Sequence, residues 1–198
     1  ACILARNMMM KDTPAESLAF TDSREVSDWA RGLVKTAVDH YVISGYPDNS
    51  FAPQQAVTKG EMAVLITRCV GNPLNQPGEY ELGDVFDNVT ITTSGVTLRN
   101  TTVSGDLYVS AGVGLGNVKL ENVRVLGRII VSGTGESEKG DASVVMRNVT
   151  ADEMLVDNMR DQLVTLRAEG LTQIGQTTVR TSAYLEDNTP DENGLRLI

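Results

Sequence analysis

Two stretches in the first third of the chain carry apolar residues at the three- and four-residue spacing of a helix. In the first, one face holds Trp29, Leu33 and Ala37, and the adjacent face holds Ala30, Val34 and Val38. Asp22 and Glu25 stand at the spacing of a capping box, in which side chains satisfy the first free amides of a helix. We therefore predict a packed helix from about Ser23 to His40, with Trp29 in the core.

The second helical stretch starts at Thr58, where Thr58 and Glu61 again have the spacing of a capping box. Its apolar face holds Met62, Leu65, Ile66 and Cys69. Before it lies the segment Gly45-Tyr46-Pro47-Asp48-Asn49-Ser50-Phe51-Ala52-Pro53. Pro47 fixes its own φ, and Asp48 and Asn49 tolerate turn geometry, so this segment predicts a tight turn.

The first ten residues resemble the end of the second helix. Ala1-Cys2-Ile3-Leu4-Ala5-Arg6 aligns with Ala63-Val64-Leu65-Ile66-Thr67-Arg68, an offset of 62 residues. We expect residues 1–10 to be the tail of a preceding repeat of the same kind, and residues 11–19 to be a polar linker. This N-terminus lacks the parts of a signal peptide, so a signal for secretion would lie outside this fragment.

After Gly83 the pattern changes to alternating apolar and polar positions with many β-branched residues. Similar 14-residue copies begin at Val96, Val118 and Val144, and a weaker copy runs from Val164 to Thr177. Repeats of about 20 to 26 residues are typical of solenoids. We predict a right-handed parallel β-helix of roughly four or five rungs over residues 84–198, joined to the helices by a linker at residues 71–83.

The alignment of the copies also predicts which side chains stack. One interior column should hold Leu98, Leu120, Met146 and Leu166, and another should hold Leu107, Ile129 and Leu155. Asn100, Asn122 and Asn148 recur at one corner, where left-handed backbone is tolerated and amide side chains can form a ladder. The segment from Ser132 to Asp141 is an insertion that we expect to protrude.

The net charge of −9 is unevenly distributed and excludes one class of partner. Residues 1–70 carry 7 basic and 8 acidic side chains, which leaves 10 basic and 18 acidic ones for the remainder. No basic stripe suited to phosphates occurs, so nucleic acid is not an expected partner. No apolar run is long enough to cross a membrane. Cys2 and Cys69 are expected to be free, buried thiols, not bonded to each other, and no metal or cofactor is expected.

Parallel β-helices also house enzymes that act on polysaccharides, whose chemistry needs paired acids or a base beside acids. The alignment instead stacks Arg99, Glu121, Arg147 and Arg167 in one column, and Asp106 above Arg128 in another. Opposite charges on neighbouring rungs indicate cross-strand pairing. The remaining acidic cluster, Asp152, Glu153, Asp157 and Asp161, is interpreted as a solvated edge. No catalytic residue is therefore predicted.

The segment from Phe20 to about Val70 resembles an S-layer homology (SLH) domain. The residues that carry the resemblance are Phe20, Asp22, Trp29-Ala30, Ile43-Ser44-Gly45-Tyr46-Pro47-Asp48, Phe51, Pro53 and Thr58-Lys59-Gly60-Glu61. In the family the last motif usually reads Thr-Arg-Ala-Glu, so Lys59 and Gly60 are departures. Tyr41 is another departure, because the family usually has glycine there. Lysine keeps the charge of arginine but loses the fork that grips a carboxylate with two bonds.

The resemblance implies a site, a partner and a location. SLH domains attach bacterial surface proteins to a cell-wall polysaccharide, often one that carries acidic pyruvate ketals, in grooves between repeats. Transferred to this sequence, the cation is Lys59, the aromatic wall is Trp29, and the turn is Gly45, Tyr46, Pro47 and Asp48. The free amides and dipole at the start of a helix independently favour an anion near Lys59. The expected location is the extracellular surface of a bacterial cell wall.

The sequence leaves three functional hypotheses. The first is a non-enzymatic cell-surface protein, in which an SLH module attaches to the wall and the β-helix is a structural or binding part. The second is a wall-anchored polysaccharide lyase or glycosidase that uses the β-helix. The third is a self-assembling surface-layer component in which copies of the chain associate.

Overall fold

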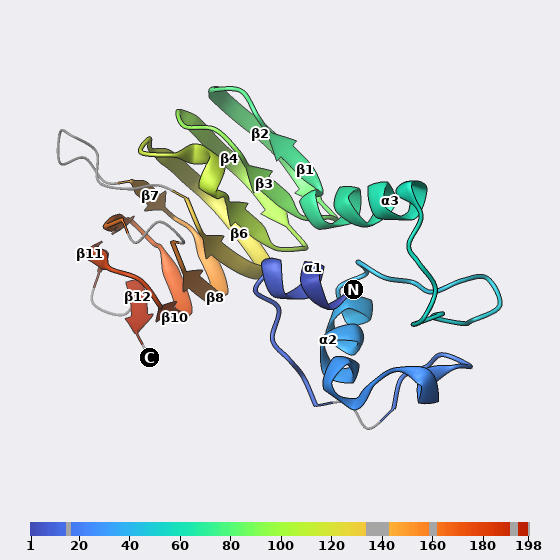
Figure 1. Cartoon of the computed structure of the whole chain (residues 1–198). Helices are drawn as coiled ribbons and strands as arrows, with labels where there is room; N and C mark the ends of the chain where they lie inside the picture. The colour runs from blue at the N-terminus through green and yellow to red at the C-terminus, as the bar shows by residue number, and fades with distance from the viewer. Residues whose placement is uncertain (15–16, 134–142, 159–161, 191–193, 198) are drawn as a thin grey trace. The chain divides into compact units, whose positions relative to one another are not determined.

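The computed structural model describes residues 1–14, 17–133, 143–158, 162–190 and 194–197. It contains two compact units, a helical unit of residues Ala1–Cys69 and a β-helical unit of residues Val70–Ile198 (Figure 1). This mixed architecture confirms the predicted fold class.

The helical unit packs around a small apolar core. Its elements are α1 (Cys2–Asn7), the 3-10 helix η1 (Ser23–Glu25), α2 (Asp28–Asp39) and α3 (Lys59–Val70), the last residue of which belongs to the second unit. The core consists of Leu18, Phe20, Val26, Ala30 and Val34, with Cys2, Val38 and Phe51 packed against it. None of the residues Lys59–Val70 of α3 is buried, so the predicted apolar face of this helix is exposed or half-buried.

The predicted start of the long helix was wrong. The chain forms one 3-10 turn at Ser23–Glu25, and α2 begins only at Asp28 with Ser27 as its N-cap. The capping box did not form because the Asp22 carboxylate accepts hydrogen bonds from distant backbone amides, those of Phe51 at 2.9 Å and Ala52 at 2.7 Å. His40 is the C-cap residue of α2, which agrees with the predicted end of the helix at about His40.

Two helix ends have the same backbone conformation at equivalent positions of the repeat seen in the sequence. Met9 follows α1 with a φ of 52°, and Gly71 follows α3 with a φ of 62°. These residues are related by the same offset as Arg6 and Arg68. Tyr41 follows α2 with a φ of 57°, and the next amide, that of Val42, donates to the carbonyl of Ala37 at 3.0 Å. This left-handed position after a helix is the one that glycine usually fills.

The β-helical unit is a coil of about five turns whose strands pair only in parallel among the described residues. Its first face is built by β2 (Gly78–Val85), β4 (Val96–Val103), β6 (Val118–Val131), β7 (Val144–Arg147), β9 (Val164–Glu169) and β11 (Ala183–Asn188). Another face is built by β1 (Asn72–Leu74), β3 (Val89–Ile91), β5 (Leu107–Val109), the end of β6, β8 (Thr150–Val156) and β10 (Gln173–Val179). The last strand, β12 (Gly194–Leu197), pairs with β10, and the short 3-10 helix η2 (Ala111–Val113) follows β5.

The interior columns are confirmed in the first rungs and corrected in the later ones. Leu98, Leu120 and Met146 are paired neighbours and fully buried, but Met146 then pairs with Ala168, and Leu166 pairs with Val144. Leu107 and Ile129 are followed by Met154, where Leu155 was predicted. In the second column the cause is a one-residue register shift between Val125 and Arg128 in β6, which an alignment without gaps cannot detect. In the first column β9 pairs with β7 two residues away from the predicted alignment, with Leu166 and not Val164 opposite Val144.

The predicted asparagine ladder is present. Asn100, Asn122 and Asn148 have φ values of 47°, 53° and 54°. The Asn122 amide donates to Asn100 at 3.2 Å, and the Asn148 amide donates to Asn122 at 2.8 Å. At the next rung Gly170, with a φ of 62°, replaces asparagine, and Asn148 Oδ1 accepts from the Leu171 amide at 2.9 Å. Each corner therefore satisfies its polar groups through the rung beside it.

Other predictions were corrected by the structure. Residues 71–83, expected as a linker, contain β1 and most of β2, because Gly, Pro and Asn stand at strand ends and corners of the first rung. Cys2 and Cys69 form no disulfide bond with each other, as predicted, but both are half-buried where burial was expected. The predicted insertion lies outside the described residues from position 134 to its end at Asp141. Within the described part of the chain, no helix is both long and apolar enough to span a bilayer.

Candidate functional site

Hydrogen bonds within the turn of residues 45–53 hold its backbone in place, and its first residue has to be glycine. The Tyr46 amide donates to the Ser50 carbonyl at 2.8 Å, and Asp48 Oδ1 accepts from the Ser50 amide at 3.0 Å. Gly45 has a φ of 72°, and a Cβ there would stand 2.5 Å from the Phe20 ring. These contacts confirm the predicted turn and explain its glycine, because neither the backbone angle nor the space admits a side chain.

Asp22 and two phenylalanines fix the turn to the core of the helical unit. The two Asp22 oxygens accept from successive amides after the turn, and the ring of Phe20 stacks on Phe51 with 5.4 Å between centroids. The hydrogen bond from the Phe51 amide, opposed by desolvation, lowers the pKa of Asp22. The carboxylate therefore stays charged while it holds two amides that would otherwise lack partners.

Glu61 joins the turn to the start of α3. Its Oε2 accepts from the Thr58 amide at 2.7 Å, and Thr58 Oγ1 accepts from the Glu61 amide at 3.2 Å, which confirms the second predicted capping box. Its Oε1 accepts from the Tyr46 hydroxyl at 2.5 Å. The hydrogen bond to Tyr46 lowers the pKa of Glu61, and the same bond raises the pKa of Tyr46. One side chain thus caps the helix and orients the tyrosine of the turn.

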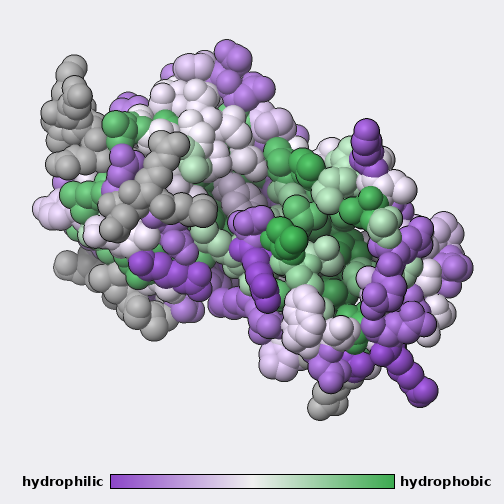
Figure 2. Space-filling model, in the orientation of Figure 1, coloured by the Kyte–Doolittle hydropathy of each residue, from purple (hydrophilic) through white to green (hydrophobic). Residues whose placement is uncertain are grey.

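A groove of about 880 Å³ lies between these elements, entirely within the helical unit. Its wall is largely apolar and exposed: Ile3 of α1 is 76% exposed, Trp29 of α2 is 65% exposed, and Val64 of α3 is 51% exposed. Figure 2 shows hydrophobic side chains gathered in this part of the molecule. The polar groups that line the groove are Glu25, Ser27, Ser44, Tyr46, Gln54, Gln55, Glu61 and Arg68.

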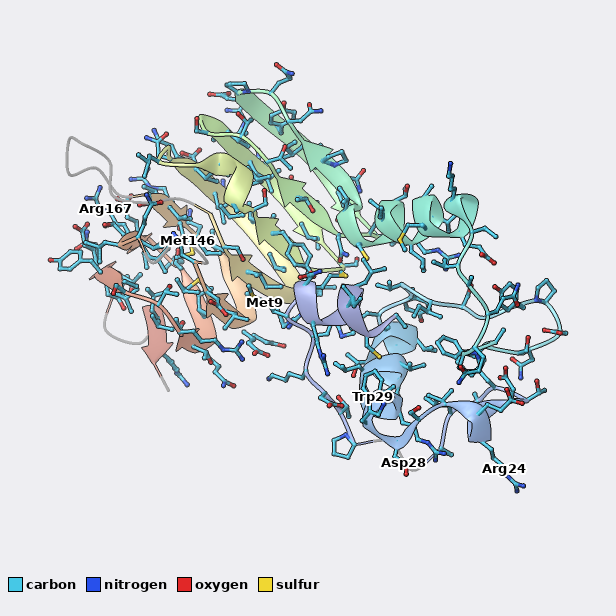
Figure 3. All side chains as sticks on the ribbon, in the orientation of Figure 1. Met9, Arg24, Asp28, Trp29, Met146 and Arg167 are labelled. Carbon is cyan, nitrogen blue, oxygen red and sulfur yellow. The ribbon has the colours of Figure 1, made fainter. Side chains whose placement is uncertain are left out.

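The interpretation of Trp29 as a core residue was wrong. The buried residues of α2 are Ala30, Gly32, Leu33, Val34, Thr36 and Ala37. Trp29 precedes this stripe on the first turn of α2 and lines the groove, as the family resemblance implied (Figure 3). A mostly apolar cleft with an exposed aromatic face and a few placed polar groups is typical of ligand sites.

The structure brings three of the six predicted site residues to this groove. Trp29, Gly45 and Tyr46 line it. Pro47 and Asp48 are in the tip of the turn, where Asp48 binds Ser50. Lys59 is the first residue of α3, exposed and outside the groove lining.

Two arginines belong to this region that sequence reasoning did not single out. Arg68 lines the groove from the last turn of α3, and the guanidinium carbon of Arg6 lies 5.9 Å from the centre of the Trp29 ring. The alignment of Ala1–Arg6 with Ala63–Arg68 paired these two residues, so the repeat was a signal that could have identified them.

Charged side chains of the β-helical unit form ion pairs between rungs. Arg128 Nη2 lies 2.7 Å from Asp106 Oδ2, with side chains 11% and 3% exposed, and Arg147 Nη2 lies 3.3 Å from Glu169. The register places Glu169 beside Arg147, where Arg167 was predicted. Asp157 lies 3.5 Å from Arg180, while Asp161 falls outside the described residues. Across the described residues, no group of three or more His, Cys, Asp or Glu side chains is arranged to hold a metal.

Comparison with known proteins identifies the segment that supplies most of the groove lining. Residues 19–63, which include η1, α2, the turn and the start of α3, match the S-layer homology domain family. This segment is an S-layer homology domain. The hydrogen bonds of Asp22, the turn at Gly45 and the cap formed by Thr58 and Glu61 all lie within the residues that match the SLH domain.

Curated relatives share this domain in otherwise different proteins. The chain is 30% identical over 94 residues to the middle cell wall protein of Brevibacillus brevis, which covers 46% of this chain and 9% of that protein. It is 40% identical over 52 residues to the surface layer protein of Brevibacillus choshinensis, covering 26% of this chain and 5% of the relative. An amylopullulanase of Thermoanaerobacterium thermosulfurigenes is 36% identical over 56 residues, which cover 28% of this chain and 3% of the enzyme.

The chain thus spans less than a tenth of the length of these relatives. The enzyme names belong to relatives that match this chain only in the SLH region. No solved structure matches the chain.

Proposed function

We propose that this chain is a cell-surface protein that attaches to a cell-wall polysaccharide through the SLH groove, with the β-helix as a structural or binding part. The observation that carries the proposal is the groove itself. It combines an exposed indole, an apolar wall and charged groups at its edge within a domain of the SLH family. The names of two relatives, a cell wall protein and a surface layer protein, support the same location.

The chemistry of the groove suits a sugar. Saccharide rings have apolar faces that stack on aromatic side chains and hydroxyl groups that need fixed hydrogen-bond partners. Trp29 supplies the flat surface. Glu61 and Ser44 supply acceptors, and because each carboxylate oxygen accepts more than one hydrogen bond, Glu61 can bind a hydroxyl while it holds Tyr46 and Thr58.

A non-enzymatic β-helix is the second part of the proposal. It is supported by the pairing of Asp106 with Arg128, of Glu169 with Arg147 and of Glu186 with Arg167, because a carboxylate held by a cation is a poor general acid. These pairs lie on neighbouring rungs and join the turns of the coil.

Attachment is tested by titrating purified cell-wall polysaccharide into the chain and into Trp29→Ala. Removal of the stacking surface should weaken binding about fivefold to tenfold, because aromatic contacts contribute about 1 kcal/mol beyond buried area. Tyr184→Ala is the matched control, since Tyr184 is an exposed aromatic residue of the β-helical unit at 56% exposure. It should leave the affinity unchanged. Absence of binding by the parent chain would overturn the proposal.

The role of the β-helix is tested by incubating the chain with the same polysaccharide and following new reducing ends and unsaturated products. We expect neither to form. Product formation that disappears in Asp106→Asn would replace the proposed structural role with catalysis and would assign that carboxylate to the reaction.

A further inference from the structure

The first rung of the β-helix leaves one long strand edge unpaired. Among the described residues β2 pairs with β4 alone, so it is the outermost strand of the first face (Figure 1). It has eight residues, and none of them is buried. The outermost strand of the other face, β1, has only three residues, and one of these, Pro73, has no backbone donor. The edge of β2 is therefore the better template for an added strand.

The apolar side chains of β2 are only partly covered. Tyr80, Leu82 and Val85 pack against the core of the β-helix but stay half-buried. Leu98, the partner of Tyr80 on the next rung, is fully buried. Phe86, which directly follows β2, is 85% exposed. The coil thus ends on this side with apolar surface that a further strand would bury.

Outward charges alternate from rung to rung in a column that begins on β2. The register gives the order Glu81, Arg99, Glu121, Arg147 and Glu169. Arg99 Nε lies 3.8 Å from Glu81, and Arg147 Nη2 lies 3.3 Å from Glu169. Opposite charges on neighbouring strands stabilise a sheet. Continued by one strand beyond Glu81, this alternation predicts a basic residue.

The other outward positions of β2 have the same sign. Glu79 is 64% exposed and lies 3.0 Å from Arg99 on its inner side, and Asp84 is exposed. The strand has no basic residue of its own. A strand beside β2 would therefore be attracted if it carried basic side chains opposite these three acids, and repelled if it carried acidic ones.

The same charges disfavour a second copy of this chain on the edge. In the last strand of the first face, β11, Glu186 continues the column of Glu79, and Asp187 continues the column of Tyr80. Head-to-tail stacking in register would bring two glutamates together and place a carboxylate over an apolar column. Two copies joined through their β2 edges would bring their acids together. Repulsion thus selects against copies and leaves the edge open to a strand of opposite charge.

We propose that the outer edge of β2 is a docking site for an extended segment of another protein. The segment adds to the coil as a parallel strand, with apolar residues over Tyr80 and Val85 and basic residues opposite Glu79, Glu81 and Asp84. This inference goes beyond attachment to the wall, and it makes the β-helix the binding part of the proposed function.

The test uses a synthetic peptide and no polysaccharide. The probe is Val-Lys-Leu-Arg-Asn-Thr-Arg-Val, which keeps the pattern of β4 and carries basic residues at its three outward positions. Fluorescence anisotropy of the labelled peptide should show binding to the parent chain. The acidic peptide Val-Glu-Leu-Glu-Asn-Thr-Glu-Val should bind on the order of tenfold more weakly or less. The basic peptide with every backbone amide methylated should not bind, because an added strand needs its amide donors.

Variants of the chain locate the peptide on the edge. Glu81→Gln should weaken binding of the basic peptide about twofold to fivefold, as expected for an exposed ion pair. Glu121→Gln is the matched control, because Glu121 is in the same column but lies between two paired strands, and it should leave the affinity unchanged. The double variant Glu79→Lys, Glu81→Lys should prefer the acidic peptide. Circular dichroism checks that each variant keeps its strands.

The remaining outcomes would overturn the inference. Equal binding of the basic and acidic peptides, or equal weakening by Glu81→Gln and Glu121→Gln, would show that the edge of β2 does not select by charge. A parent chain that binds neither peptide would show that the edge does not accept a strand. Association of the parent chain that increases with concentration and is abolished by Glu81→Lys would assign the edge to a second copy. None of these results bears on attachment to the wall, since no polysaccharide is present.

Discussion

Tyr41 occupies a backbone position that disfavours it. Its φ of 57° lies in the left-handed region, and its side chain is 85% exposed, so the residue makes little packing contact in compensation. A residue with a Cβ in this conformation costs about 1 kcal/mol relative to glycine. Glycine, the usual residue of the family at this position, removes that cost.

We therefore expect Tyr41→Gly to raise the free energy of unfolding of the helical unit by about 1 kcal/mol. Denaturant unfolding followed by Trp29 fluorescence measures the change. Tyr41→Ala is the matched control, because it removes the same ring but keeps the Cβ, and it should give no gain. A gain of equal size in both variants would show that the aromatic ring, and not the backbone angle, is unfavourable.

Thr177 places a hydroxyl inside the β-helix. It is fully buried in the column that continues from Met154, and its Oγ1 has no hydrogen-bond partner among the residues that the structure describes. A buried polar atom without a partner costs about 1 to 3 kcal/mol, and valine has nearly the same shape. Thr177→Val should raise the unfolding free energy by about 1 kcal/mol.

Thr101 is the control for this prediction. It is 2% exposed, but its hydroxyl accepts from the Leu82 amide at 3.1 Å and donates to the Arg99 carbonyl at 2.8 Å. Thr101→Val should therefore destabilise the β-helix by about 1 to 2 kcal/mol, because it leaves those backbone groups unpaired. Denaturation followed by the strand signal in circular dichroism distinguishes the two variants, and destabilisation by both would contradict the account of Thr177.

Among the contacts between elements, the hydrogen bond that joins the turn to α3 contributes a stability that depends on pH in both the acidic and the basic range. Tyr46 lowers the pKa of Glu61 below its usual 4.5, and Glu61 raises the pKa of Tyr46 above its usual 10.0. A lowered carboxyl pKa contributes stability that is present above pH 4.5 and lost as the pH falls through the folded value. A raised tyrosine pKa contributes stability that is present below pH 10.0 and lost as the pH rises through the folded value.

Tyr46→Phe removes this hydrogen bond. The melting temperature should therefore be lower than that of the parent between pH 4.5 and pH 10.0, and it should fall less steeply than that of the parent below and above this range. Melting temperatures from pH 3 to pH 11 measure the effect, and Tyr184→Phe serves as an exposed tyrosine control. A profile for Tyr46→Phe that is parallel to the parent at both extremes would mean that the hydrogen bond to Glu61 does not form in solution.

Two capping boxes were predicted from the same residue spacing, but only one of them formed. Thr58 and Glu61 formed their capping box because both partners lie within one helical turn. Asp22 and Glu25 have the same spacing, but the amides of Phe51 and Ala52 took the Asp22 carboxylate. A local motif predicts a cap only when no distant donor competes for the same oxygen.

At the scale of the whole molecule, the two units differ in how much apolar surface their helices and strands bury, and this difference affects how readily their backbone amides are exposed to solvent. The β-helix buries a continuous column of apolar side chains, while α3 buries none of its residues. Helix α2 has the same length of 12 residues as α3 but buries one side of its surface. Local opening requires least free energy where few apolar contacts must be broken.

Hydrogen exchange should therefore rank the central strands β4 and β6 as slowest, α2 as intermediate and α3 as fastest. Addition of a saturating amount of cell-wall polysaccharide should slow exchange in α3 and in the turn without changing β4 or β6. Mass spectrometry of peptic fragments resolves these segments. Protection of the β-helix by the polysaccharide, with α3 unchanged, would place the ligand on the other unit.

The sequence by itself determined the class of the β-helix, its asparagine corner and the SLH turn, because each depends on residues that are close in the chain or repeat at regular intervals. The register of the later rungs follows only from the folded structure, since a one-residue bulge in β6 changes which side chains of β8 stack on it, and β9 pairs with β7 two residues away from the predicted alignment. The folded structure also decided the groove. Trp29 is exposed and Arg68 lies at the groove edge because of how α1, α2 and α3 meet, and no local pattern encodes the distance between helices that are separated by tens of residues.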